Sequence, residues 1–186
     1  MKKENVIYRK AELKDFDSLI ELLIFMPKTG GFDGVLPADR ESGERFIKGL
    51  FDKNAAILLA TYKASSPPSA LRAISPSPIK DTKSSILLGS TEVILGCLIL
   101  DERKVWWSER PVLSNIVFYV YPGEPRKLGI QKRFIEIIKG LSRQAKLPFI
   151  LDMFSPRDTE HLEPYFKING FRHIGSKFAF IPTTYS

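Results

Sequence analysis

The sequence contains few of the residues that form disulfide bonds, zinc sites or membrane spans. It has one cysteine and two histidines, so an internal disulfide is excluded and a zinc site lacks ligands at suitable spacing. No stretch approaches the roughly 18 uncharged apolar residues needed to span a bilayer. The opening MKKENVIYRK places charges where a secretory signal would be apolar. We therefore expect a cytoplasmic protein without a membrane partner.

What the sequence does contain is typical of one soluble domain covering residues 1–186. Hydrophobic residues make up 44% and charged residues 26% of the chain, which is long enough for a single core. The formal net charge of +7 favours an anionic partner, either a phosphate-bearing cofactor or nucleic acid. Cys97 lies in the apolar run VILGCLIL and is expected in the core rather than as a nucleophile.

Hydrophobic patterns alternate between strand-like and helix-like along the chain. Apolar residues at helical spacing predict helices at 13–26, 40–51, 130–145 and 158–169. Runs rich in β-branched and aromatic residues predict strands at 6–10, 55–62, 92–102, 112–121, 147–154 and 171–181. The strands at 92–102 and 112–121 should be buried on both faces and pair with each other. Residues 27–39 are expected to form a loop, and the Ser/Pro-rich segment 63–85 a mobile insertion. This order predicts an α/β fold with a mixed α+β sheet.

The stretch PGEPRKLGIQKRF, residues 122–134, joins a predicted strand to a predicted helix. Such a turn exposes main-chain N–H groups at the positive end of the helix dipole, which favours phosphate binding. Gly129 allows a ligand to approach the main chain. Positive charge around the turn comes from Arg126, Lys127, Lys132 and Arg133. The common nucleotide motifs G-x-G-x-x-G and G-x-x-x-x-G-K-S/T are absent from the sequence, so the stretch predicts a phosphate site of another kind.

At these residues the sequence resembles the GCN5-related N-acetyltransferases (GNAT). The family motif Q/R-x-x-G-x-G/A, which follows the fourth strand and holds the pyrophosphate of acetyl-CoA, is matched by RKLGIQ at 126–131. The preceding VYP, the later YFKINGF at 165–171 and the opening IYRKAELKDFDSLIELL are similar to other family segments. The likeness covers 5–62 and 91–181, and WWSERPVL at 106–113 is similar to acetyltransferases of tailed phages and prophages.

The resemblance implies a mostly antiparallel central sheet that is splayed between its fourth and fifth strands, with helices on both faces. Acetyl-CoA would lie in this splay and donate its acetyl group to a primary amine that attacks directly. The residues implied in cofactor binding are Tyr119, Val120, Arg126, Lys127, Leu128, Gly129, Ile130, Gln131 and Lys132. Tyr165 is the implied general acid for the departing thiolate, and Phe32 and Asp33 would shape the acceptor pocket.

Two departures from the family pattern concern the cofactor and the general acid. Gln131 stands where the motif ends in a small residue, and its longer side chain either crowds the pyrophosphate or bonds to it. In the later signature Phe166 occupies the tyrosine position and Tyr165 comes one residue earlier, about 100° away around a helix. Pro164 is expected to delay or kink that helix, which could return Tyr165 to the site.

A third departure concerns the general base. Asn115 lies eleven residues before Arg126, where lysine acetyltransferases of the family have a glutamate. An amide cannot take up a proton, so water would relay it. Glu124 and Asp33 are the alternative carboxylates, and each is otherwise a solvated loop residue.

The acceptor and two other function classes stay open at this stage. The acceptor amine could belong to a small molecule, a peptide or a nucleic-acid-linked group such as aminoacyl-tRNA. One alternative is a binding or structural module, phage-related or regulatory, that keeps the fold without the chemistry. Another is a nucleic-acid binder that uses the basic turn and the Ser/Pro-rich insertion. A second copy of the chain, as in a homodimer, is a further partner to consider.

Overall fold

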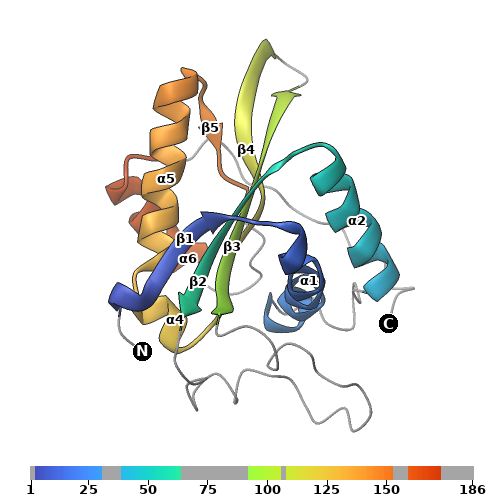
Figure 1. Cartoon of the computed structure of the whole chain (residues 1–186). Helices are drawn as coiled ribbons and strands as arrows, with labels where there is room; N and C mark the ends of the chain where they lie inside the picture. Colours follow the sequence, from blue (N-terminus) through green and yellow to red (C-terminus); the bar gives the residue numbers. More distant parts are fainter. Residues whose placement is uncertain (1–2, 31–38, 64–91, 106–107, 153–158, 173–186) are drawn as a thin grey trace, which may run out of the picture.

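The computed structural model describes residues 3–30, 39–63, 92–105, 108–152 and 159–172 (Figure 1). Its strands are β1 (Val6–Lys10), β2 (Ala56–Lys63), β3 (Glu92–Val105), β4 (Ser108–Val120) and β5 (Phe149–Ile150). Its helices are α1 (Phe16–Gly30), α2 (Arg40–Asp52), α4 (Glu124–Lys127), α5 (Ile130–Ala145) and α6 (Thr159–Ile168), with short 3-10 turns at Lys3–Asn5 and Leu13–Asp15. The predicted insertion at 63–85 and strand at 171–181 lie almost wholly outside the described residues.

The five strands form one mixed sheet in the order β1-β2-β3-β4-β5. Neighbouring strands are antiparallel from β1 to β4, and β4 pairs with β5 in parallel. The predicted pairing of the two long apolar strands is confirmed, since β3 and β4 are partners over ten residue pairs that run from Gly96 with Val120 to Val105 with Ser108. The predicted mixed α/β fold is therefore correct.

Helices cover both faces of the sheet, and each face has its own core. On one side α1 and α2 enclose the α1/α2 core, which includes Leu19, Ile47, Cys97, Ile99 and Val117. On the other side α5 encloses the α5 core, which includes Leu98, Val120, Leu128, Ile130 and Phe134. Successive residues of β4 alternate between these two cores, as expected of a strand buried on both faces. Cys97 is fully buried, as predicted.

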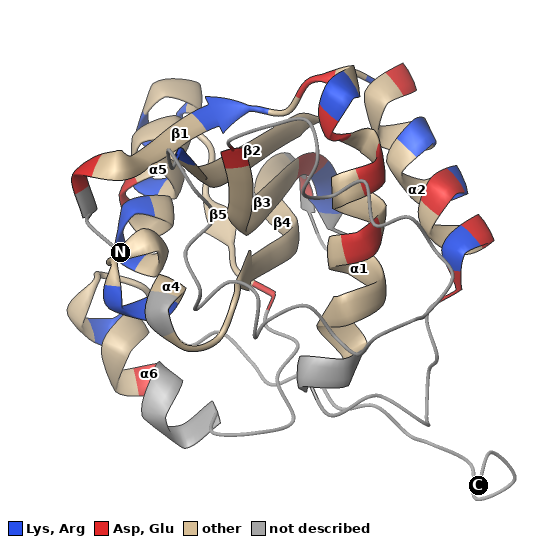
Figure 2. Cartoon of the chain, turned by 60° about the horizontal axis from the view of Figure 1, so that its bottom comes forward, with Lys and Arg blue, Asp and Glu red and all other residues tan. Residues whose placement is uncertain are grey.

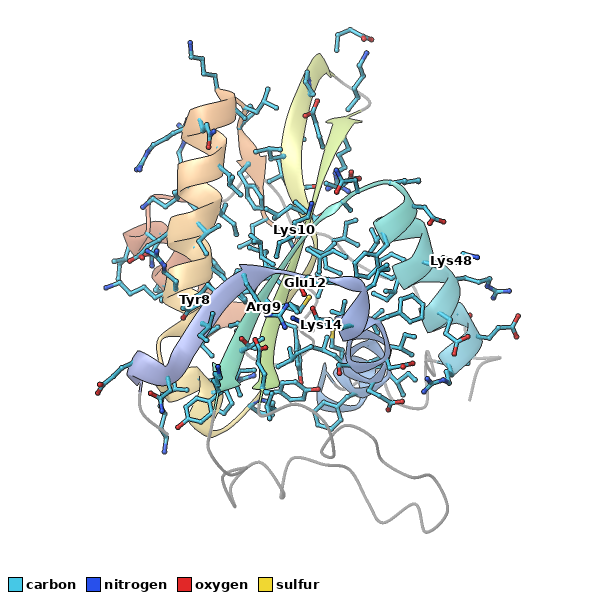
Figure 3. The ribbon with its side chains drawn as sticks, viewed as in Figure 1. Tyr8, Arg9, Lys10, Glu12, Lys14 and Lys48 are labelled. Carbon is cyan, nitrogen blue, oxygen red and sulfur yellow. The ribbon has the colours of Figure 1, made fainter. Side chains whose placement is uncertain are left out.

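The start of the chain is tied to the middle of the sheet by Arg9 of β1 (Figure 3). Its guanidinium donates two hydrogen bonds to the carboxylate of Asp15, at 2.7 and 2.8 Å, and a third from Nε to Glu92 at 2.8 Å. The Asp15 carboxylate also accepts the N–H of Glu12 at 2.8 Å, which closes the turn before α1. This pair therefore fixes the angle at which α1 leaves β1.

Several predicted boundaries were wrong. The strand predicted to end at 102 continues to Val105, and the strand predicted to begin at 112 begins at Ser108. The first helix was expected to end at 26, but α1 continues through Pro27 to Gly30. Leu22 and Met26 in the preceding turn pack against the α1/α2 core, so the loss of one main-chain hydrogen bond at the proline does not end the helix. The strand expected at 147–154 is only two residues long, Phe149–Ile150, because its ladder with β4 stops at Ser114.

Candidate cofactor site

The turn between β4 and α5 is built on two glycines with positive φ. Gly123 has φ 81° and ψ −134°, and the short helix α4 follows it with a proline in its first turn. Gly129 has φ 74° and ψ 20°, the left-handed conformation that favours glycine, and it is the N-cap of α5. The main chain is thus reversed sharply just before a helix of 16 residues. This helix, α5, has the bounds predicted from the sequence, 130–145.

Two residues implied in cofactor binding, Leu128 and Gly129, use their main-chain N–H groups inside the turn. The N–H of Leu128 donates to Pro125 at 3.2 Å and that of Gly129 to Arg126 at 3.4 Å. Arg133 is the first residue of α5 whose N–H reaches a carbonyl one turn back, that of Gly129 at 3.1 Å. The N–H groups of Ile130, Gln131 and Lys132 therefore have no partner within the helix and point out of its positive end.

Basic residues lie before and after these three N–H groups along the chain. Figure 2 shows Lys and Arg on α4 and on the adjoining part of α5. The exposed members are Arg126, Lys127, Lys132 and Arg133. Arg133 is paired with Glu136 one turn further along α5, at 3.0 Å. The turn therefore presents fixed N–H donors together with cationic side chains, the donor set that suits a phosphate group.

The apolar residues of the turn hold it against the end of β4. Leu128 and Ile130 are buried in the α5 core together with Val120. Phe134, fully buried, makes edge-to-face contacts with Phe118 of β4 at 5.9 Å and with Tyr8 of β1 at 6.1 Å. Strand end and helix start are consequently one rigid unit, so the N–H groups of α5 have a defined position relative to β4.

Among the described residues, no strand lies beside one edge of β4 over its C-terminal half. Parallel pairing with β5 is confined to Leu113 with Phe149 and Ser114 with Ile150. The opposite edge stays paired with β3, and there Tyr121 donates its N–H to Leu95 at 3.0 Å. Because main-chain groups of alternate residues point to opposite edges, those of Phe118 and Val120 face away from β3. The sheet thus opens between β4 and β5 beside the α5 N-terminus.

A register shift marks the place where β4 and β5 part. Ile99 is paired with Val117 and Leu100 with Asn115, so Ile116 is an extra residue on β4. Such a bulge bends a strand and redirects its side chains. Asn115 beside it is buried, and its side chain exchanges two hydrogen bonds with the main chain of Asp152. A polar residue inside the apolar run VLSNIVFYV was the sequence signal for this feature.

Aromatic side chains line the α1/α2 face next to the open edge. The ring of Tyr121 lies 5.3 Å from that of Phe25 on α1 and 5.2 Å, edge to face, from that of Tyr119. Burial, more than the neighbouring Tyr119 and Glu21, raises the pKa of the Tyr121 phenol. Tyr121 is therefore neutral at physiological pH, and this wall is apolar with hydroxyl groups.

Tyr119, implied in cofactor binding, and Tyr165, the implied general acid, lie in different surroundings. The carbonyl of Tyr119 points toward Gly96 of β3, so its main chain does not face the open edge, whereas that of Val120 does. Tyr165 is half-buried on α6, where its ring contacts Phe166 edge to face at 5.4 Å. Burial, and then Glu136 on α5, raise the pKa of its phenol. Phe166, the next residue of this helix, is buried in the core.

Several other predicted features were tested only in part. The helix α6 begins at Thr159 and runs through Pro164, so it does not start late. Phe32 and Asp33 lie outside the described residues, and the side chain of Glu124 is not described. Within the described part of the chain no three His, Cys, Asp or Glu side chains gather as a metal site. None of the described helices is long and apolar enough to cross a membrane.

Solved structures of acetyltransferases share this fold. An acetyltransferase of Trypanosoma brucei matches with a TM-score of 0.60 and 18% identity over 95% of this chain and 99% of its own. A GNAT family acetyltransferase of Staphylococcus aureus matches at 0.55 with 15% identity, covering 95% and 98%. An aminoglycoside 6'-N-acetyltransferase of Acinetobacter baumannii matches at 0.59 with 14% identity, covering 94% and 96%. The fold is therefore that of the GNAT acetyltransferases.

Comparison of the sequence, unlike comparison of the structure, finds no similar protein. No protein-family model and no curated protein matches the chain. At identities below 20% the structural likeness establishes the fold and leaves the reaction to be argued from the residues. The comparisons give no support to the narrower likeness with phage-encoded acetyltransferases.

Proposed function

We propose that the protein is an N-acetyltransferase that takes its acetyl group from acetyl-CoA and transfers it to a primary amine. The observation that carries this proposal is the position of the α5 N-terminus beside the open edge of β4. The basic turn lies next to a strand edge that has no partner strand among the described residues, and Leu128, Ile130 and Val120 hold the two together. This arrangement suits a ligand with a diphosphate at one end and an amide-containing arm at the other.

The turn residues would hold the diphosphate of acetyl-CoA. The N–H groups of Ile130, Gln131 and Lys132 supply donors, and the left-handed Gly129 has no side chain to obstruct them. Arg126, Lys127 and Lys132 add positive charge at the surface. The partly buried Gln131 would bond to the diphosphate through its amide. Leu128 contributes through its buried side chain, because its N–H is used within α4.

The edge of β4 would hold the arm that carries the acetyl group. The main-chain groups of Phe118 and Val120 face this edge and can pair with the amides of the arm as an added strand. Tyr119 would contribute its side chain on the α1/α2 face. When bound, acetyl-CoA supplies an activated acyl group, and a main-chain N–H near the bulge at Ile116 would stabilise negative charge that develops on its carbonyl oxygen.

Orientation is the main catalytic contribution we assign to this chain. Asn115 uses both ends of its amide on Asp152 and cannot accept a proton, so we assign proton removal from the amine to water. Tyr165, neutral because burial raises its pKa, is the candidate proton donor to the departing thiolate. Holding the amine and the acyl group in line supplies most of the acceleration in such a site.

The acceptor would approach from the α1/α2 face, where Phe25, Tyr119 and Tyr121 form an apolar wall. Phe32 and Asp33, on the segment that follows α1, are proposed to complete this pocket, with Asp33 attracting the ammonium group. The acceptor panel for assay should contain polyamines, peptides with free N-termini and aminoacyl-tRNA. It should also contain aminoglycosides, because one compared acetyltransferase is named for them.

Calorimetric titration with acetyl-CoA tests the proposed cofactor. We expect wild type to bind, and Gly129→Asn to bind at least about tenfold more weakly, because asparagine tolerates the left-handed conformation but places a side chain over the donors. Gly170→Asn is the matched control, because Gly170 also has a positive φ and ends a different helix. Absence of any binding by wild type at millimolar acetyl-CoA would refute the proposed function.

A second titration separates an enzyme from a binding module. If wild type binds acetyl-CoA but releases no CoA with any amine of the panel, the fold is kept for binding alone. Affinity for single-stranded nucleic acid that falls steeply with salt, with no affinity for acetyl-CoA, would instead favour the nucleic-acid reading that the charge of +7 allows.

A further inference from the structure

Asn115 lies at the position where the parallel ladder between β4 and β5 ends. The last paired residues are Ser114 and Ile150, and just before them Leu113 donates its N–H to Pro148 at 2.9 Å. Asn115 follows directly and is only 5% exposed. Its position in the strand means that its main chain, like that of Leu113, faces the β5 side.

The side chain of Asn115 takes the hydrogen bonds by which the ladder would have continued. In a parallel ladder in this register the next donor of the β5 chain is the N–H of Asp152, and its acceptor is the main-chain carbonyl of Asn115. In this structure the N–H of Asp152 donates to Oδ1 of Asn115 at 2.8 Å instead. Nδ2 of Asn115 donates to the carbonyl of Asp152 at 2.7 Å. One amide side chain thus replaces a peptide unit.

The Asn115 side chain, by taking the place of a main-chain partner, sets the width of the opening between β4 and the chain that follows β5. A side chain inserted between two main chains holds them farther apart than the about 4.8 Å of a paired ladder. Arg103 of β3 fixes Asp152 from a second direction, by donating from its Nη2 to the carboxylate at 2.5 Å. Immediately after Asn115 the extra residue Ile116 shifts the register of β4, so main-chain pairing does not resume among the described residues.

We propose that Asn115 is a positioning residue that ends the β4–β5 ladder and holds the β4 edge open for the acyl-bearing arm of acetyl-CoA. The inference rests on the proposed function for the identity of the ligand. Asn115 meets both main-chain groups of Asp152 without charge, which requires one donor and one acceptor on a short side chain. An aspartate has the same shape and lacks the donor unless it is protonated.

Asn115→Asp gives a test with a pH signature. Above its pKa the carboxylate faces the Asp152 carbonyl without a proton to donate, and we expect acetyl-CoA to bind about tenfold more weakly than to wild type at pH 8. Burial and the hydrogen bond of its neutral form raise the pKa of such a carboxyl group. On lowering the pH to 5.5 the protonated group should donate again and bring the ratio of the two dissociation constants to within about twofold.

Asn54→Asp is the matched control. Asn54 is an exposed asparagine with φ 51° whose Oδ1 accepts from Lys10, far along the chain from β5. The same chemical change there should leave the affinity ratio to wild type constant between pH 5.5 and 8. Measuring each ratio against wild type at the same pH removes the titration of acetyl-CoA itself.

Exchange of the Asp152 amide hydrogen gives a readout that does not depend on the ligand. It should be slow in wild type and in Asn54→Asp, and faster in Asn115→Asp at pH 8 after correction for the intrinsic pH dependence. If wild type fails to bind acetyl-CoA while exchange behaves as expected, the proposed function fails and the structural role of Asn115 stands.

Two results would overturn the inference. One is an Asn115→Asp variant that binds as tightly as wild type at pH 8. The other comes from Asn115→Gln, which is used if Asn115→Asp does not fold. Glutamine keeps the donor and the acceptor but is one methylene longer, so it should weaken acetyl-CoA binding equally at both pH values. Wild-type affinity in Asn115→Gln would show that the width of the opening is set by other residues.

Discussion

Gly96 of β3 lies directly against the main-chain carbonyl of Tyr119 on β4. A Cβ atom on Gly96 would come within 2.8 Å of that oxygen and within 3.3 Å of the Phe134 ring. The close approach brings β3, β4 and α5 together next to the proposed cofactor site. Glycine is required here for space, because Gly96 does not have a positive φ.

Gly96→Ala should therefore destabilise the protein by about 1–3 kcal/mol, the usual cost of forcing a methyl group into a packed core. Chemical denaturation monitored by tryptophan fluorescence gives the free energy of unfolding. Gly140→Ala is the control, because nothing lies within 4 Å of a Cβ at this position of α5 and alanine favours the helix by about 0.5–1 kcal/mol. Equal stabilities of the two variants would mean that β3 and β4 are farther apart than described.

The Arg9 and Asp15 pair should make stability depend on pH in the acid range. Burial alone would raise the pKa of Asp15, but its hydrogen bonds with Arg9 and with the Glu12 N–H outweigh this and hold the pKa below its ordinary value. The Arg9 hydrogen bond likewise lowers the pKa of Glu92. A lowered folded-state pKa gives stability that is complete above the unfolded-state value, about 3.9 for Asp, and is lost as the pH falls through the folded-state pKa.

We therefore expect Asp15→Asn to lower the free energy of unfolding at pH 7 by about 1–3 kcal/mol, with a shallower loss of stability below about pH 4 than wild type. Thermal unfolding between pH 2.5 and 7 measures both. Glu41→Gln, which removes an exposed ion pair with Arg45, should change stability by less than about 0.5 kcal/mol. Parallel pH profiles for wild type and Asp15→Asn would contradict the assignment.

Cys97 should be inert toward thiol reagents in the folded protein. Its side chain is fully buried among Leu59, Ile99 and other residues of the α1/α2 core, and burial raises the pKa of the thiol well above its ordinary value. Ellman's reagent should detect no thiol in native protein and one per chain in guanidinium chloride. Rapid reaction of native protein would show that β3 is not covered by α1 and α2. The expected inertness also leaves the thiol of released CoA as the only reactive thiol in a transfer assay.

Tyr165→Phe should lower kcat for acetyl transfer by about 10²-fold if the phenol protonates the thiolate, while KM for acetyl-CoA stays within about twofold. Tyr62→Phe makes the same chemical change in a buried tyrosine of β2 and should leave kcat unaltered. A kcat for Tyr165→Phe equal to that of wild type would remove this residue from catalysis and leave it as packing between α6 and α5.

Much of the architecture could be predicted from local patterns. The helix α5 has the predicted bounds, and α2, β1 and β2 agree to within one residue at each end, because apolar periodicity and turn residues act over a few neighbours. The long apolar runs correctly predicted that β3 and β4 are paired. The predicted end of α1 was wrong, because packing of the turn before Pro27 outweighs the loss of one main-chain hydrogen bond at this proline.

The candidate site, too, could be predicted from the sequence only in part. Gly129 and the basic residues of the turn were identified from sequence, because a left-handed glycine before a helix has a local signature. The sequence did not show which N–H groups lack a partner, because those of Leu128 and Gly129 donate to carbonyls of α4. The position of Tyr165 relative to the cofactor stays a prediction.

The sequence by itself determined where the chain turns, which runs enter the core and that a basic, glycine-containing turn precedes a helix, because each depends on residues close together along the chain. Only the tertiary structure decided which strand edge is open. Asn115 and Asp152 are 37 positions apart, and whether their contact uses a side chain or a main chain follows from the register of three strands and the bulge at Ile116. That register is a collective property of the packed sheet.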